Sequence, residues 1–264
     1  MRNVLLAAFL LFCSLEGTEV SEKLQSIPPK DKEKIEFFFS YLVQRDNLGF
    51  VLFGNTKTAA FCSIPIVCNY ALVPKLVTKT PLQYQKNLKQ SWAVWARYRT
   101  RFKHPNIIVC EEHDRFNKSA FLQLIFIDKR KLAHLLEQYR EDFEEVLGEN
   151  FSSADFIAKI EKKRKLRPLI NRDEKLLGLI LGFGKESSTG FKNMQNEEAA
   201  DPNFKMAGRR PKACCIVPVS FRGNPDSTEV KALVETYTKE ILEIEDIFKS
   251  DSFLTDILEK FCSP

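Results

Sequence analysis

The densest group of side chains able to do chemistry lies between residues 104 and 114. It contains two imidazoles, one thiol and three carboxylates: His104, Cys110, Glu111, Glu112, His113 and Asp114. Cys110 and His113 could pair as thiolate and imidazolium, with an adjacent carboxylate orienting the imidazole. Residues 107–110 are typical of a strand, on which these two side chains point to opposite faces unless the strand ends between them. The alternative is a solvent-exposed strand end without a catalytic function.

Patterns for other reactions and for bound metals are missing from the sequence. Cys214 and Cys215 are adjacent, so they lack the two-residue gap of a zinc-binding pair. The motifs Gly-x-Ser-x-Gly and His-Glu-x-x-His do not occur. A catalytic pair of carboxylates cannot be located from sequence. We therefore predict no metal and no cofactor, and keep as an alternative an exported hydrolase that uses Cys110 and His113 or an unlocated carboxylate pair.

Three glycines before a lysine suggest a phosphate-binding loop, but their spacing does not fit one. Gly178 and Gly184 enclose five residues, where a Walker A loop has four, and Glu186 follows Lys185 where Ser or Thr is required. The glycines are better interpreted as helix-packing positions with a helix C-cap.

A basic and aromatic segment is the best candidate for binding an anionic surface. Residues 75–103 contain eight basic residues and no acid. At 100° per residue the aromatic side chains of residues 92–102 fall within an arc of about 120°. Such a face could dock on anionic lipid or stack on nucleic acid bases. The candidate residues are Trp92, Trp95, Arg97, Arg99, Arg101 and Lys103.

The opposing interpretation of this segment is that its aromatic arc packs on the sheet while the cations stay solvated. The C-terminal residues 226–262 carry ten acids and four bases and would partly neutralise the cations. A membrane surface therefore remains a possible partner, and nucleic acid is not favoured.

The N-terminal residues predict export. One positive charge at Arg2 precedes an unbroken apolar run from Val4 to Phe12, the pattern of a secretory signal peptide. Nine apolar residues are too few for a membrane span, which needs about 20. We predict a signal peptide over residues 1–17 and a destination in the periplasm or outside the cell. Anchoring of a lipid on Cys13 is the alternative, although the bulky Phe12 argues against it.

Composition indicates an ordinary globular protein. The chain is 44% hydrophobic and 28% charged, with a net charge of +5. Its 22 phenylalanines, against six tyrosines and two tryptophans, indicate core filling. Six cysteines follow the predicted signal peptide, and we expect one disulfide at most, because free cysteine usually behaves as a small buried apolar residue.

Apolar spacing predicts an α+β fold in a single globular domain over residues 18–264. We expect about five mostly antiparallel strands packed with about six helices. The predicted helices lie near residues 31–48, 86–97, 128–147, 153–167, 174–183 and 230–248, and the predicted strands near residues 50–53, 59–62, 107–110, 122–127 and 213–221.

Two glycine-containing motifs carry a resemblance to a known group of proteins. They are Leu48-Gly49-Phe50-Val51-Leu52-Phe53-Gly54, after a Phe-rich helix, and Leu176-Leu177-Gly178-Leu179-Ile180-Leu181-Gly182-Phe183-Gly184-Lys185-Glu186. Together they resemble uncharacterised exported proteins of chlamydia-like bacteria, over most of the chain after residue 17. The motifs are packing patterns, so the resemblance implies no activity and assigns no functional residue.

These observations favour a non-enzymatic exported protein that binds another macromolecule or is structural. Its partner would be an unidentified protein. The alternatives are the exported hydrolase described above and a peripheral envelope protein that contacts anionic lipid through Trp92–Lys103.

Overall fold

The structure is a computed structural model that describes residues 19–67, 82–116, 119–195, 205–208 and 214–263. Its centre is a three-stranded antiparallel sheet of β1 (Ala59–Val67), β2 (Ile107–Phe116) and β3 (Ser119–Asp128), in the order β1-β3-β2. The central strand β3 is apolar on both sides because helices cover both faces of the sheet. Strands β2 and β3, which contain the predicted strands at residues 107–110 and 122–127, pair as a hairpin without a break from Ile107–Asp128 to Phe116–Ser119.

One face of the sheet packs against the two ends of the chain. Leu122, Leu124 and Phe126 of β3 join a core cluster built from five helices. These are α2 (Pro29–Arg45), α3 (Leu48–Leu52), α4 (Leu82–Tyr98), α10 (Thr228–Phe248) and α11 (Phe253–Cys262). The predicted apolar stripe of α2 is confirmed, since Ile35, Phe38, Phe39, Leu42 and Val43 are buried.

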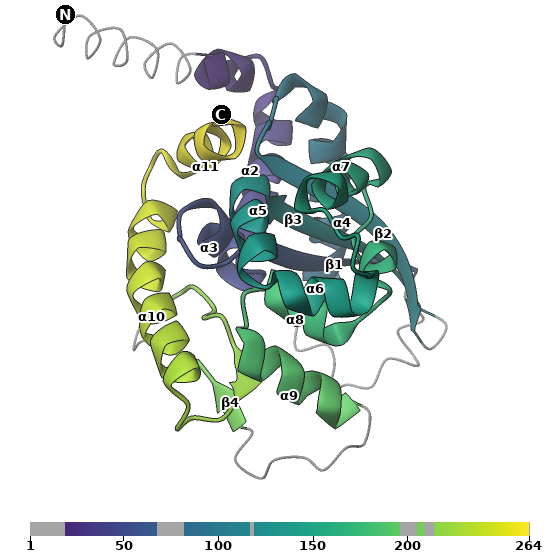
Figure 1. Cartoon of the computed structure of the whole chain (residues 1–264). Helices are drawn as coiled ribbons and strands as arrows, with labels where there is room; N and C mark the ends of the chain where they lie inside the picture. Colours follow the sequence, from purple (N-terminus) through teal and green to yellow (C-terminus); the bar gives the residue numbers. More distant parts are fainter. Residues whose placement is uncertain (1–18, 68–81, 117–118, 196–204, 209–213, 264) are drawn as a thin grey trace, which may run out of the picture.

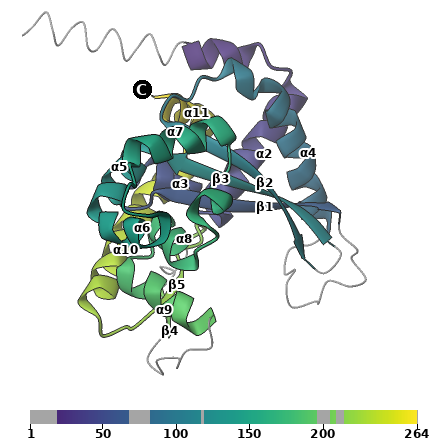
Figure 2. The ribbon, with the colours of Figure 1, turned by 45° about the vertical axis from the view of Figure 1, so that its right-hand side comes forward.

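The middle of the chain covers the other face. Ile125 and Ile127 of β3 pack there in a second core cluster. Its helices are α5 (Lys129–Gln138), α6 (Arg140–Leu147), α7 (Ser153–Lys163), a 3₁₀ helix at Arg167–Ile170, and α8 (Glu174–Ile180). Figure 2 shows α2 and α4 on one side of the sheet and α5, α6 and α7 on the other.

A smaller unit lies beyond α8, at the bottom of Figure 1. It consists of α9 (Lys185–Gln195) and the two-stranded antiparallel sheet of β4 (Lys205–Ala207) and β5 (Phe221–Gly223). The predicted fold class, α+β with about five mostly antiparallel strands, is confirmed. The helices are more numerous than predicted, partly because the predicted helix at residues 128–147 breaks at Tyr139 into α5 and α6.

Four predicted strands differ from the structure, and one of them, predicted at residues 107–110, continues as β2 to Phe116. Residues 50–53, predicted as a strand, belong largely to the helix α3, where every residue is buried. The prediction was wrong because a short run of apolar residues fits a buried strand and a buried helix equally well. Of the predicted strand 213–221, Phe221 alone is in a strand; residues 214–220 are irregular. β1 continues through Pro65 to Val67, because an edge strand tolerates a missing N–H donor, and its register shifts there.

Several predictions fall outside the described residues or stay open. The predicted signal peptide and Cys13 lie outside them, and so does Cys68. The other five cysteines after residue 17 lie in the described part of the chain, and no disulfide joins any two of them: Cys62, Cys110, Cys214, Cys215 and Cys262.

No helix in the described ranges is both long and apolar enough to span a membrane.

Candidate functional site

The structure does not bring Cys110 and His113 together. Strand β2 runs on to Phe116 without a bulge, so the two side chains leave opposite faces of the sheet. Cys110 is fully buried in the cluster under α5 and α7, and burial raises the pKa of its thiol to about 12. A thiol in that state does not act as a nucleophile at neutral pH.

The carboxylates beside this pair have positions in the hydrogen-bond network. Glu112 is buried, and its Oε1 accepts the backbone N–H groups of Leu166 (2.5 Å) and Arg167 (3.0 Å). Asp114 accepts from the Gln123 amide at 2.9 Å. Glu112 thus holds the start of the 3₁₀ helix against β2.

The aromatic side chains of the predicted anion-binding segment belong to the core. Trp92 and Trp95 are buried, and so is Phe102. Trp95 packs edge-on against Phe39, with 4.9 Å between ring centroids, and Trp92 lies 5.6 Å from the ring of Phe38. This arrangement matches the packing interpretation of the aromatic arc.

The cations of that segment are partly paired. Arg97 Nη2 lies 3.4 Å from Asp31, and Arg99 Nη1 lies 2.5 Å from Glu111. The remaining two, Arg101 and Lys103, are exposed. Without exposed tryptophans the segment lacks the apolar anchors of an interfacial helix, so we do not propose lipid docking there.

The glycines of the second motif are packing residues, as the sequence indicated. A Cβ on Gly178 would lie 2.6 Å from Ser188 Oγ, so glycine lets α8 and α9 approach closely. Gly182 and Gly184 have φ values of +78° and +79°, which turn the chain between these helices. Both carboxylate oxygens of Glu229 accept backbone N–H groups at the start of α9, where a bound phosphate would sit, at 2.8 Å each.

The most extensive candidate site is a series of three adjoining cavities that share Leu177. A polar cavity of about 360 Å³ and a middle cavity of about 260 Å³ share Arg167 and Leu177. The middle cavity shares Leu181, Phe183 and Ser220, besides Leu177, with an apolar cavity of about 340 Å³. We call these three cavities the Leu177 groove.

The polar end of the groove is organised around Arg167. Its Nη1 lies 3.3 Å from Asp114, and its guanidinium stands 5.4 Å from the ring centre of Phe61. Its Nε is buried without a hydrogen-bond partner. Lys165 and Arg172 line the same cavity, together with His113, the predicted site residue. Arg167 thus places a guanidinium with one unpartnered N–H donor at the polar end of the groove.

The middle of the groove contains two ionisable groups in unusual environments. The side chain of Lys57 is almost fully buried, and its Nζ donates to the Leu181 carbonyl at 2.7 Å. Burial lowers the pKa of this amine to about 7, against the raising effect of the Glu240 charge. Burial also raises the pKa of the Asp46 carboxyl to about 7, against the lowering effects of a Cys62 hydrogen bond and of Arg45. Such opposite shifts within one cavity are typical of functional sites.

The apolar end of the groove is built from α8, α9 and the small sheet. Phe183 and Phe221 stack with ring centroids 5.8 Å apart. Phe191 and Met206 complete this wall, and Met206 is 66% exposed. An exposed apolar side chain at the mouth of an apolar cavity provides an entry for an apolar chain.

Unpartnered polar atoms are concentrated along this groove. Among the described residues, eight buried side-chain nitrogen or oxygen atoms have no hydrogen-bond partner in the chain. Five of the eight belong to residues that line the three cavities: Asp46, Asn47, Gln123, Arg167 and Ser187. Buried polar groups are normally satisfied, so these atoms need partners that the chain does not supply, from water or from a bound molecule.

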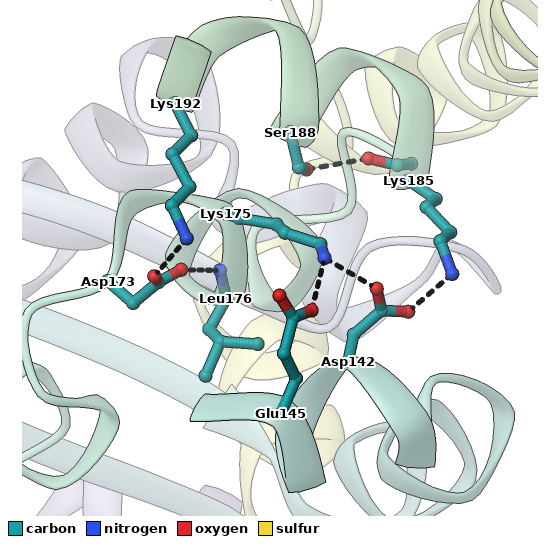
Figure 3. A network of polar contacts seen from close by, with 9 residues as sticks. Asp142, Glu145, Asp173, Lys175, Leu176, Lys185, Ser188 and Lys192 are labelled. Carbon is teal, nitrogen blue, oxygen red and sulfur yellow. Dashed lines mark hydrogen bonds and ion pairs between the residues drawn. The ribbon is translucent and has the colours of Figure 1, made fainter. Parts of the chain in front are cut away.

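A network of ion pairs braces the wall of the groove (Figure 3). Lys175 of α8 bonds to Asp142 and Glu145 of α6, and Lys185 of α9 reaches the other oxygen of Asp142 at 2.9 Å. Lys192 of α9 bonds to Asp173, the N-cap of α8. The pairs therefore fix α8 and α9 to each other and to α6.

Asp142→Asn should weaken this bracing in a pH-dependent way. Burial alone would raise the pKa of Asp142, but Lys175 and Lys185 outweigh it and hold the pKa below its usual value. The ionised carboxylate thus stabilises the fold above about pH 4, and this contribution is lost as the pH falls through the lowered folded-state pKa. Urea unfolding at pH 7 should show a loss of about 2 kcal/mol in the variant.

The matched control is Glu145→Gln, which removes the exposed partner of the same lysine and should cost under about 0.5 kcal/mol. Equal losses for the two variants, or a loss for Asp142→Asn that persists undiminished at pH 2, would contradict the assignment.

A second cleft lies between α5 and α10. It measures about 620 Å³ and is lined by residues such as Thr56, Lys131, His134 and Thr236. Lys131, however, donates to the carbonyls of Val51 (2.6 Å) and Gly54 (2.5 Å), so its ammonium serves the end of α3. The Leu177 groove has the stronger chemical signal, because five of its lining residues have a buried polar atom without a partner in the chain.

Sequence reasoning missed the principal residues of this groove. Asp46 follows α2, Lys57 precedes β1 and Arg167 ends a basic block, and no motif joins these positions. One signal was present: Arg167 precedes Pro168 directly, which places it at the start of a helical turn.

The described residues contain no group of three or more His, Cys, Asp or Glu side chains arranged to hold a metal ion. Comparisons with models of protein families, with curated protein sequences and with solved structures found no match. The resemblance to exported proteins of chlamydia-like bacteria therefore stays a prediction.

Proposed function

We propose that the protein binds a single-chain aliphatic carboxylic acid in the Leu177 groove. The observation that carries this proposal is the concentration of unpartnered polar atoms along a groove that is polar at one end and apolar at the other. The carboxylate would lie at Arg167, and the chain would extend past Phe183 toward Phe191 and Met206.

Charge favours a carboxylate over a doubly charged phosphate at the polar end. Lys165, Arg167 and Arg172 line this cavity, but so do three acidic residues. These acids are Glu112, Asp114 and Glu174. A nearly balanced set of charges suits a monoanion, and the guanidinium fork matches the two oxygens of a carboxylate.

The test is calorimetric binding of dodecanoate to the full chain and to Arg167→Met, which keeps an unbranched apolar stem. Charge-assisted bonds contribute about 1.5–3 kcal/mol, so we expect about 10- to 100-fold weaker binding in the variant. Arg140→Met removes an exposed arginine of α6 outside the groove and should bind as the parent does. Equal affinities for dodecanoate and dodecanol, no binding, or unchanged binding in Arg167→Met would contradict the proposal.

Export, predicted from residues 1–17, is compatible with this role and stays a prediction. The predicted protein partner is likewise untested, and the hydrolase alternative has no support from the positions of Cys110 and His113.

A further inference from the structure

Lys57 occupies the junction between the polar and apolar parts of the Leu177 groove. Its side chain is 3% exposed, and it lines the middle cavity together with Asp46 and Arg167. The Nζ atom stands 5.1 Å from the ring centre of Phe183, which also lines the apolar cavity. A primary amine is thus placed where a ligand chain would pass from its charged head to its apolar tail.

The surroundings of this amine favour its neutral form. The Nζ atom donates a hydrogen bond to the Leu181 carbonyl, and the aromatic ring of Phe183 covers another side of the amine. The carboxylate that acts on it electrostatically is Glu240 of α10. Because burial outweighs this charge, the pKa falls to about 7, and a substantial fraction of the amine has a free lone pair at neutral pH. A desolvated lysine of this kind is the nucleophile of imine-forming sites.

Lys131 provides a comparison within the same chain. Burial lowers the pKa of Lys131 as well, but its ammonium is held by the carbonyls of Val51 and Gly54. These contacts use the N–H donors of Lys131 and hold its nitrogen at the end of α3, where it also reaches the backbone carbonyl of Lys57 at 3.5 Å. Both lysines line a cavity and have a lowered pKa, and they differ in that Lys57 lines the Leu177 groove and donates to one backbone carbonyl, whereas Lys131 donates to several.

A proton donor lines the same cavity. Asp46 Oδ2 is buried and has no hydrogen-bond partner in the chain. Since burial raises the pKa of this carboxyl to about 7, it is partly protonated at neutral pH. A protonated carboxyl can protonate a leaving hydroxyl group.

We propose that Lys57 forms a reversible imine with a ketone or aldehyde carbonyl, so that the groove selects aliphatic acids that carry an oxo group. This inference rests on the proposed function, because Arg167 and the apolar wall place the ligand carbonyl beside Nζ. The order of groups along the ligand would be carboxylate, carbonyl and apolar chain, which matches the order Arg167, Lys57 and Phe183 along the groove.

The reaction balances without an oxidant or a reductant. The neutral Nζ attacks the carbonyl carbon, and the C–N bond forms while the carbonyl oxygen gains a proton. The resulting carbinolamine loses its hydroxyl group as water after taking up a proton from solvent, and the nitrogen returns a proton to solvent. The nitrogen gives up its two protons overall, so that the products are the imine and one water molecule. Hydrolysis by the reverse steps releases the ligand.

The experiment uses 4-oxododecanoate as the probe and cyanoborohydride to reduce any imine to a stable amine. The full chain is treated at pH 8, and the adduct is located by intact mass and peptide mapping. We expect one adduct, at Lys57, forming at least about tenfold faster than at exposed lysines, because an ordinary lysine with a pKa near 10.4 is almost entirely protonated at this pH. Lys131 in the same sample is the internal control for a buried lysine outside the groove.

Two variants extend the test. Lys57→Met should abolish the fast adduct, and Arg167→Met should slow its formation about tenfold or more through weaker binding of the carboxylate. Labelling of Lys57 no faster than that of exposed lysines, or equal labelling of Lys57 and Lys131, would overturn the inference. The peptide map of the parent chain decides this even if Lys57→Met does not fold.

Failure of the proposed function is distinguishable from failure of this inference. If dodecanoate binds and 4-oxododecanoate displaces it without an adduct at Lys57, the imine is refuted and carboxylate binding stands. If dodecanoate does not bind while decanal gives an adduct at Lys57, the amine chemistry stands. In that case the selection of oxo acids by the groove is refuted.

Discussion

The stability of Lys57→Met relative to that of the parent protein should be higher at pH 7 than at pH 10. In the unfolded chain the Lys57 amine has a pKa near 10.4, whereas burial lowers its folded-state pKa to about 7. Because folding lowers this pKa, the free energy of unfolding of the parent is highest above the unfolded-state pKa of Lys57. It decreases as the pH falls from that pKa to the folded-state pKa. Across this window the parent should lose about 4 kcal/mol that Lys57→Met does not lose.

The difference between the two proteins isolates this effect from other groups that titrate in the same window. Around Lys57 the charged or titratable groups are Glu240 of α10 and, on the same cavity, Asp46 after α2 and Arg167 of the 3₁₀ helix. These remain in the variant. Loss of the bond to the Leu181 carbonyl adds an offset of about 1 kcal/mol that does not depend on pH.

Urea unfolding of parent and variant between pH 7 and pH 10 measures the prediction. Lys239→Met, which removes an exposed lysine of α10, should give a curve parallel to that of the parent. If the curves of Lys57→Met and the parent are also parallel, Lys57 is not desolvated as the structure indicates. The low-pKa amine on which the imine depends would then be absent.

Trp95→Ala should destabilise the protein by about 3–5 kcal/mol, the usual cost of removing a large buried aromatic side chain. Trp95 is 1% exposed, and its ring contacts Phe39, Phe102 and Phe261 at centroid distances of 4.9–6.2 Å. The loss comes from both the apolar surface no longer buried and the cavity left behind. Denaturant unfolding at pH 7 provides the measurement.

The same variant separates the two interpretations of the basic and aromatic segment. Arg101→Ala, at an exposed position six residues further along, is the matched control and should change stability by less than about 0.5 kcal/mol. A stability of Trp95→Ala equal to that of the parent, together with weaker pelleting on anionic vesicles, would instead make Trp95 part of a lipid-binding surface.

Local patterns in the sequence determined the class of the fold and most of its elements. The stripe Ile35, Phe38, Phe39 and Leu42 requires a helix with one face buried, and the same holds for Val230, Tyr237, Ile241 and Ile244 in α10. The β-rich runs around Val109 and Ile125 pair as a hairpin. These elements follow from the sequence because the periodicity of side chains along a helix or strand is a local property.

Tertiary structure decided the identity of α3 and the whole of the candidate site. Residues 48–52 are apolar on every side, so their spacing favours neither the period of a helix nor that of a strand. Packing against α10 and β1 selects the helix. Asp46, Lys57, Arg167 and Phe183 come from four separate parts of the chain and meet at one cavity. The shifted pKa values of Lys57 and Asp46 arise from their enclosure by residues distant in sequence, and enclosure is a property of the folded chain that no local spacing of residues can express.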